Sequence, residues 1–181
     1  DFFDITLKGV SGHAAHPHTT VDTITAAAYF ITQLQTIVSR EIAPIDPAVV
    51  SIGQIEGGTA RNIIASEVRL SGGIRGQSTE VMKRVEETMR RLLDGIKAGM
   101  RVDYELDYRL AVPVLRNDKA ILDRVLSSAR GILGDENVEL LPSYSMGSED
   151  LAFFTERFPS AHLRIGSKID GLDTMLHQAN Y

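Results

Sequence analysis

The stretch FFDITLKGVSGHAAHPH, residues 2–18, holds the pattern around which the rest of the chain is organised. Its first half alternates apolar and polar side chains, which predicts a strand over residues 2–9 with one face buried. The apolar side chains of this strand are Phe3, Ile5 and Leu7. Its second half changes character abruptly, so the strand should end in a turn before the next element begins.

That turn contains three histidines, His13, His16 and His18, within six residues. Pro17 lacks a backbone N–H and fixes one φ angle, so the strand cannot continue through it. Small alanines beside His13 leave its imidazole room to reach outward. A turn histidine bonded to local backbone is the plain interpretation, and an imidazole offered to a substrate oxygen is the functional one.

Composition limits the classes of function. The chain has 181 residues, 43% of them hydrophobic, and a formal net charge of −5, which argues against a general nucleic-acid surface. It has no cysteine, so disulfides and thiol nucleophiles are excluded, and this fits a cytoplasmic protein. No apolar run reaches the length of a membrane span. Because the chain starts at Asp1 and ends shortly after His177, we expect a fragment or an excised domain.

The next hundred residues alternate between two periodicities. Apolar residues recur at three- and four-residue steps where helices are expected, and at two-residue steps where strands are expected. The elements predicted are a helix over 20–39, strands over 48–55 and 63–74, a helix from Ser78 or Thr79 to just before Gly99, and a strand over 101–110. The order β-α-β-β-α-β predicts an α+β, ferredoxin-like domain over residues 1–112.

The pattern changes after Pro113. We expect a helix capped by Asn117 or Asp118, then short strands over 138–141 and 161–166 around a short helix over 151–158. These pieces are too few for a closed core. We therefore interpret residues 113–181 as the incomplete C-terminal segment of a larger α/β domain.

Two polar residues flank the strand at 63–74. Asn62 precedes it, and Arg75 follows it directly after Gly72, Gly73 and Ile74. The small neighbours suggest that something approaches this arginine closely, and an accessible guanidinium suits a bidentate carboxylate. An ordinary surface arginine is the alternative.

Two further stretches could line a site. SMGSED places Gly147 and Ser148 before a short helix, either as a helix cap with two acids or as the floor of an active site. His177 lies beside apolar residues in the final loop and could ligate a metal, although one histidine cannot hold a catalytic zinc.

Together, these stretches resemble the peptidase M20 family of metallo-amidohydrolases, in the branch of hippurate hydrolases, indole-acetyl-amino-acid hydrolases and N-acyl-amino-acid deacetylases. The resemblance follows the family's order along nearly the whole chain. The stretches that carry it are FDITLKGVSGHAAHPH, LQTIVSRE, DPAVVSIGQIEGGTARNIIA, GGIR, MGSEDLAFF and LHQANY.

The resemblance implies roles for these residues. Residues 1–112 match the lid, or dimerisation, domain, which pairs in a homodimer. His13 matches the lid histidine that reaches into the partner's active site and polarises the scissile carbonyl. Asn62 and Arg75 match substrate contacts, with Arg75 holding a carboxylate. Gly147 and Ser148 match the floor loop, and His177 matches the last ligand of a two-metal site.

The same resemblance shows what these 181 residues lack. The family's other ligands for its two zinc or manganese ions, and its general-base glutamate, belong to a segment that is not in this sequence. We therefore expect a part of an enzyme that hydrolyses N-acyl amino acids or small peptides, inactive by itself. A non-catalytic ferredoxin-like module for dimerisation or small-ligand binding is the alternative.

Overall fold

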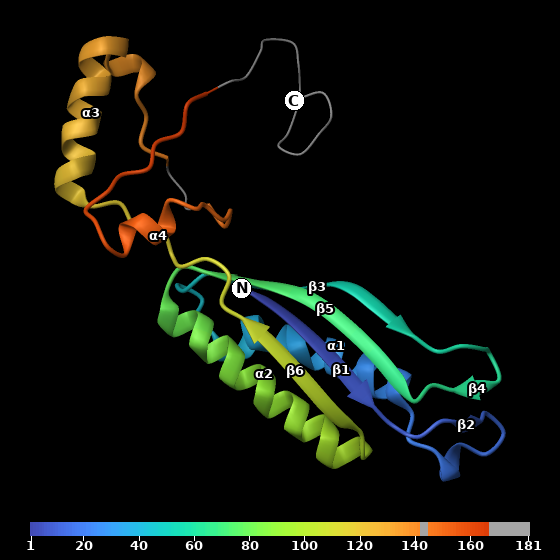
Figure 1. The fold of residues 1–181 in the computed structure, drawn as a ribbon. Coiled ribbons are helices and arrows are strands. Elements are labelled where there is room, and N and C mark those ends of the chain that lie inside the picture. The colour runs from blue at the N-terminus through green and yellow to red at the C-terminus, as the bar shows by residue number, and fades with distance from the viewer. Residues whose placement is uncertain (142–144, 167–181) are drawn as a thin grey trace.

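The structure, a computed structural model, describes residues 1–141 and 145–166 (Figure 1). Its strands are β1 (Phe2–Lys8), β2 (Gly12–His13), β3 (Ala48–Gly57), β4 (Ile63–Ile64), β5 (Glu67–Gly76) and β6 (Asp103–Arg109). Its α-helices are α1 (Thr23–Thr36), α2 (Thr79–Met100), α3 (Lys119–Leu133) and α4 (Ala152–Thr155). Short helical turns of other kinds are Pro17–Thr19, Ile37–Glu41 and Asp135–Asn137.

Four strands form one antiparallel sheet in the order β3-β5-β1-β6. Helices α1 and α2 lie on the same face of this sheet (Figure 1). The predicted α+β class and the β-α-β-β-α-β order of the first part are therefore confirmed. β1 is a central strand, and its residue Phe3 lies opposite Gly72 on one side and Tyr108 on the other.

The core fills the space between the sheet and the two helices. Phe3, Ile5 and Leu7 of β1 are all at most 1% exposed, as the alternation of the sequence predicts. Phe30 of α1 and Met89 of α2 are fully buried in the same cluster. Each such side chain contributes about 1.5–3 kcal/mol by leaving water, so β1 and its two helices hold the domain together.

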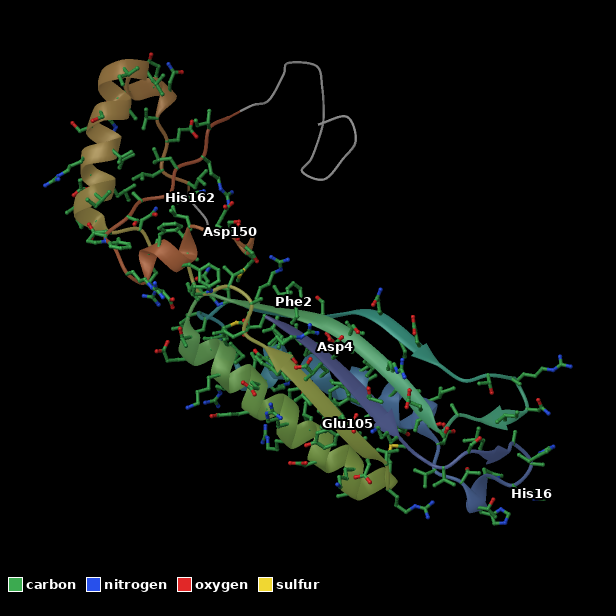
Figure 2. All side chains as sticks on the ribbon, in the orientation of Figure 1. Phe2, Asp4, His16, Glu105, Asp150 and His162 are labelled. Carbon is green, nitrogen blue, oxygen red and sulfur yellow. The ribbon has the colours of Figure 1, made fainter. Side chains whose placement is uncertain are left out.

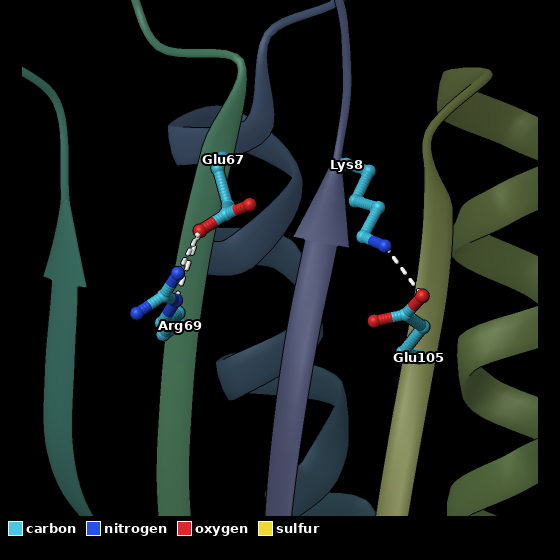
Figure 3. Close-up of polar contacts among 4 residues, drawn as sticks. All are labelled: Lys8, Glu67, Arg69 and Glu105. Carbon is cyan, nitrogen blue, oxygen red and sulfur yellow. Dashed lines mark hydrogen bonds and ion pairs between the residues drawn. The ribbon is translucent and has the colours of Figure 1, made fainter.

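The opposite face of the sheet carries paired charges. Lys8 on β1 binds Glu105 on β6, and Arg69 on β5 binds Glu67 on the same strand at 2.8 Å (Figure 3). These side chains are exposed, and exposed ion pairs contribute about 0–1 kcal/mol each. Their main effect is to make this face of the sheet suitable for contact with solvent. The domain therefore needs helices on the other face only.

The strand predicted over 63–74 is two strands. Ile63 and Ile64 form β4 and pair with β2 in a separate two-stranded sheet, whereas β5 begins at Glu67 and runs to Gly76 in the main sheet. Both halves alternate in sequence, and alternation alone cannot show that the chain changes partner between them.

Helix ends differ from the prediction at two places. Helix α1 begins at Thr23 rather than at residue 20, and Asp22 caps it, with its carboxylate accepting from the Thr25 N–H at 3.0 Å. Helix α2 continues through Gly99 and ends at Met100, and the C-cap residue Arg101 has a left-handed φ of 62°. The predicted caps Ser78 and Asp118 are confirmed.

The strands predicted over 138–141 and 161–166 do not form in the described part of the chain. A strand is stabilised by the backbone hydrogen bonds of a neighbouring strand. Residues 138–141 and 161–166 do not pair with each other or with the main sheet, so their apolar side chains lie exposed. Leu140, Leu141 and Ile165 are all among the exposed large hydrophobic residues.

Candidate functional site

His13 and Asn62 come together in a small projection from the main sheet, residues 10–20 and 58–65, which we call the arm. In the arm, β2 pairs with β4 so that His13 lies opposite Ile63. The Ala14 N–H donates to the carbonyl oxygen of Asn62 at 3.0 Å. The pairing brings together two predicted site residues, His13 and Asn62, that are 49 positions apart in the sequence (62 − 13).

The His13 imidazole is exposed and its Nδ1 atom is occupied. The Ala15 N–H donates to His13 Nδ1 at 3.0 Å. A neutral imidazole that accepts at Nδ1 carries its proton at Nε2. Local bonding, the plain interpretation of this histidine, is therefore confirmed, and it prepares the other nitrogen as a hydrogen-bond donor.

His16 and His18 lie in the same loop. The ring centroid of His16 is 6.0 Å from that of His13 and 6.1 Å from that of His18. Among residues 1–141 and 145–166, no group of three or more His, Cys, Asp or Glu side chains is arranged to hold a metal. This part of the chain therefore does not by itself fit a two-metal site, and His177 lies outside the described residues.

Arg75 lies at the other end of the sheet, near the end of β5. Its Nη1 atom donates to the carbonyl oxygen of Met146 at 2.6 Å. Gly147 follows directly, and its N–H donates to Ser145 Oγ at 3.1 Å. The guanidinium of Arg75 thus reaches the loop that contains Gly147 and Ser148, and all three residues are exposed.

The predicted site residues therefore form two groups rather than one. β5 has ten residues, and at about 3.3 Å per residue it separates the groups by about 30 Å. In Figure 2, His16 of the arm lies at one end of the sheet, and Asp150 and His162 lie beyond the other end. Neither group alone combines the histidine and the arginine.

The capping interpretation of the SMGSED stretch is wrong. Helix α4 begins at Ala152 with Leu151 as its cap residue, and no side chain caps it. Ser148 and Glu149 lie in irregular chain before that helix. The Glu149 carboxylate instead faces His162, with 3.9 Å between Oε1 and Nε2.

Sequence reasoning missed residues that hold the arm. Ser11 Oγ donates to the carbonyl oxygen of Ile64 at 2.9 Å, and Thr23 Oγ1 donates to that of Ala65 at 2.8 Å. A threonine at the first position of a helix is common enough to give no signal by itself. What distinguishes Thr23 is that its side chain is 0% exposed, and this burial can be seen only in the structure.

The domain that these elements build matches a known family. Residues 2–100 match the peptidase dimerisation domain of M20 peptidases. The chain belongs to the M20 peptidase family, and the predicted resemblance is confirmed.

Among curated relatives, an N-acetyldiaminopimelate deacetylase from Halalkalibacterium halodurans is 40% identical over 162 residues, which cover 90% of this chain and 43% of that protein. The enzyme of the same name from Bacillus cytotoxicus is 37% identical over 163 residues, with 90% and 43% covered. The chain thus spans about two fifths of the length of these relatives.

Solved structures agree with this assignment. A dinuclear metal-binding peptidase of the M20 family from Bacillus subtilis superposes with a TM-score of 0.69 and 28% identity, over 88% of this chain and 38% of that one. Aminopeptidase PepT from Bacillus cereus, at 21% identity and a TM-score of 0.71 over 88% and 41%, shows the fold alone. No helix among the described residues is long and apolar enough to cross a membrane.

Proposed function

We propose that this chain is the lid domain, residues 1–112, and the C-terminal segment, residues 113–181, of a homodimeric M20 enzyme. The enzyme hydrolyses the amide bond of N-acyl amino acids or small peptides with two divalent metal ions, zinc or manganese. The relatives named as deacetylases support the reaction class. The observation that carries the proposal is the division of the candidate residues between the two ends of β5.

The edge strand β3 is the surface that we propose for pairing. The other edge strand, β6, presents a charged side chain at every second position from Asp103 to Arg109, which is how sheets discourage further pairing. β3 instead exposes Val49 and Ile55, and the neighbouring helix α1 exposes Ile24 and Tyr29. An apolar edge beside an apolar helix face suits a second copy of the same surface.

Antiparallel pairing of β3 with its copy explains the divided site. Gly57, at the arm end of β3, would lie beside the start of the partner's β3. That start is next to Arg75, because Val49 is the register partner of Arg75. The arm of one protomer would therefore approach the partner's Arg75 end. One subunit supplies His13 and Asn62, and the other supplies Arg75, Gly147 and Ser148.

The proposed site gives each of these residues a chemical role. The His13 Nε2–H donates to the carbonyl oxygen of the scissile amide and stabilises the negative charge that develops there. The Arg75 guanidinium exchanges its bond to the Met146 carbonyl for the substrate carboxylate, which binds it in bidentate fashion. Metal ions, when bound by the longer enzyme, supply activated water.

A mixing experiment tests the shared site in the longer enzyme. His13→Ala and Arg75→Ala enzymes are each expected to be inactive. In a heterodimer of the two, one composite site has both mutations and the other has neither. Random exchange of subunits in a two-fold dimer should then restore about a quarter of wild-type activity. If each site used its own arm, every site in the mixture would have a mutation and no activity would return.

The pairing surface is tested on this chain directly. We expect Ile55→Lys on β3 to convert a dimer to a monomer in sedimentation velocity. Asp107→Lys on β6 is the matched control, because it also introduces a lysine on an edge strand, and it should leave the dimer intact. A dimer that survives Ile55→Lys and is lost with Asp107→Lys would place the interface at β6.

A further inference from the structure

The arm is attached to the rest of the domain at a small set of contacts. The Gly9 N–H donates to the carbonyl oxygen of Ser66 at 2.8 Å. Val10 and Val21 form an isolated antiparallel bridge, with N–O distances of 3.1 and 3.0 Å. Arg101 Nη2 also donates to the carbonyl oxygen of Thr20, which is buried, at 3.4 Å. Beyond these contacts the chain of the arm is exposed almost throughout, so its orientation depends on this base.

Thr23 is the side chain at the centre of that base. It is the first residue of α1 and is 0% exposed, and its Oγ1 donates to the carbonyl oxygen of Ala65 at 2.8 Å. Ala65 is also buried and lies between β4 and β5, where the chain leaves the arm for the main sheet. One buried hydrogen bond therefore ties the start of α1 to the point where the arm returns.

The packing around this bond leaves little freedom. A Cβ atom on Gly9 would lie 2.3 Å from the carbonyl oxygen of Val21 and 2.7 Å from Cγ2 of Thr23. Both distances are below van der Waals contact, so the strand that enters the arm is pressed against the start of α1. The hydroxyl and the methyl of Thr23 thus contact both strands of the arm base, one through Ala65 and the other through Gly9.

We propose that Thr23 is a positioning residue, whose buried hydroxyl fixes the arm and so sets where His13 and Asn62 are held. The inference rests on the proposed function for its catalytic meaning and on the geometry alone for its structural meaning. Replacing Thr23 by valine keeps the shape and removes the donor, which leaves the buried Ala65 carbonyl without that partner.

Hydrogen exchange tests the structural part on this chain. Thr23→Val should speed exchange of the Ala14 N–H, which is bonded to Asn62, by about tenfold to a hundredfold, the range expected for loss of a buried hydrogen bond. The backbone amides of β1 should speed up by no more than the change in unfolding free energy, measured in urea, accounts for. Thr23→Ser keeps the donor and should restore protection at Ala14.

Thr88→Val is the matched control, because Thr88 is another buried threonine, on α2. It should leave the Ala14 rate unchanged. Unchanged exchange in Thr23→Val, or an equal rise in Thr88→Val, overturns the proposal. If Thr23→Val destabilises the whole sheet, the amides of β1 report it, and Thr23→Ser then decides the matter by whether Ala14 stays protected.

Kinetics of the longer enzyme test the catalytic part separately. Thr23→Val should lower kcat by a larger factor than it raises KM, because Arg75, which holds the substrate carboxylate, lies at the far end of the sheet and only the Asn62 contact moves with the arm. Thr23→Ser should recover kcat. Faster exchange at Ala14 with a wild-type kcat would contradict the role proposed for the arm in catalysis and would leave the structural assignment of Thr23 intact.

Discussion

Gly72 and Gly73 are adjacent in the same strand, yet the structure predicts opposite responses to the same substitution. A Cβ atom on Gly72 would lie 2.3 Å from Phe3 Cζ and 2.3 Å from the carbonyl oxygen of Ser51. A Cβ atom on Gly73 would meet nothing closer than 3.7 Å. Phe3 is a central core residue and Ser51 offers a backbone atom, so neither can move aside at low cost.

The expected magnitudes follow from these distances. Gly72→Ala should lower the free energy of unfolding by about 1–3 kcal/mol, the usual cost of overpacking a core. Gly73→Ala should be neutral or stabilise by up to about 1 kcal/mol, because alanine restricts the unfolded chain more than glycine does. With a urea m-value of about 2 kcal/mol/M, the two midpoints should differ by about 1 M.

Urea unfolding followed by far-UV circular dichroism measures the difference, and tyrosine fluorescence serves as a second probe because the chain has no tryptophan. Equal midpoints for the two variants would refute the reasoning. Gly72 would then have to be small for another reason, such as access of a ligand to Arg75. The sequence suggested that reason, whereas the structure assigns the space beside Gly72 to Phe3.

Three further predictions concern activity, titration and helix capping. The 181-residue chain with added zinc or manganese should not hydrolyse an N-acyl amino acid faster than its His177→Ala variant, and turnover above that control would contradict the proposal. Burial, with Glu86 adding to it, raises the pKa of Tyr108 to about 12. Unfolded tyrosine ionises near pH 10. The raised pKa of Tyr108 therefore contributes its whole share of the free energy of unfolding below pH 10, and this share is lost as the pH rises to about 12. Tyr108→Phe should remove that loss in base titrations. Asp22→Ala should lower the free energy of unfolding by about 1 kcal/mol in urea, because it removes the cap of α1, whereas Asp22→Asn should keep most of it.

The first domain could be predicted from sequence because its signals are local. Phe3, Ile5 and Leu7 alternate because one face of β1 is buried, and Ser78 and Asp118 cap helices through atoms three residues away. The arm could not be predicted in the same way. Its existence depends on Gly12 and His13 pairing with Ile63 and Ile64, about fifty positions along the chain, and alternation gives no partner.

The sequence proposes a set of candidate site residues but not their arrangement. The family resemblance is what singles out His13, Asn62, Arg75, Gly147 and Ser148, and their roles stay predictions. Their division into two groups needs the register of the sheet, because only β5 fixes how far Asn62 lies from Arg75. Thr23 was not predictable at all, since only its complete burial distinguishes its hydroxyl from that of any other threonine.

The arm and the proposed pairing at β3 together give a reason why a domain of this shape would act with a second copy. A rigid four-stranded sheet cannot fold back to bring His13 to the Arg75 of its own chain, because β5 joins the two ends as a straight strand about 30 Å long. The proposed two-fold axis at β3 would solve this problem without any bending, since it would reverse the strand direction and place opposite ends together. If the proposed pairing and the proposed role of Thr23 both hold, the length of β5 has to match the dimer, and the orientation of the arm sets whether His13 reaches the partner's site.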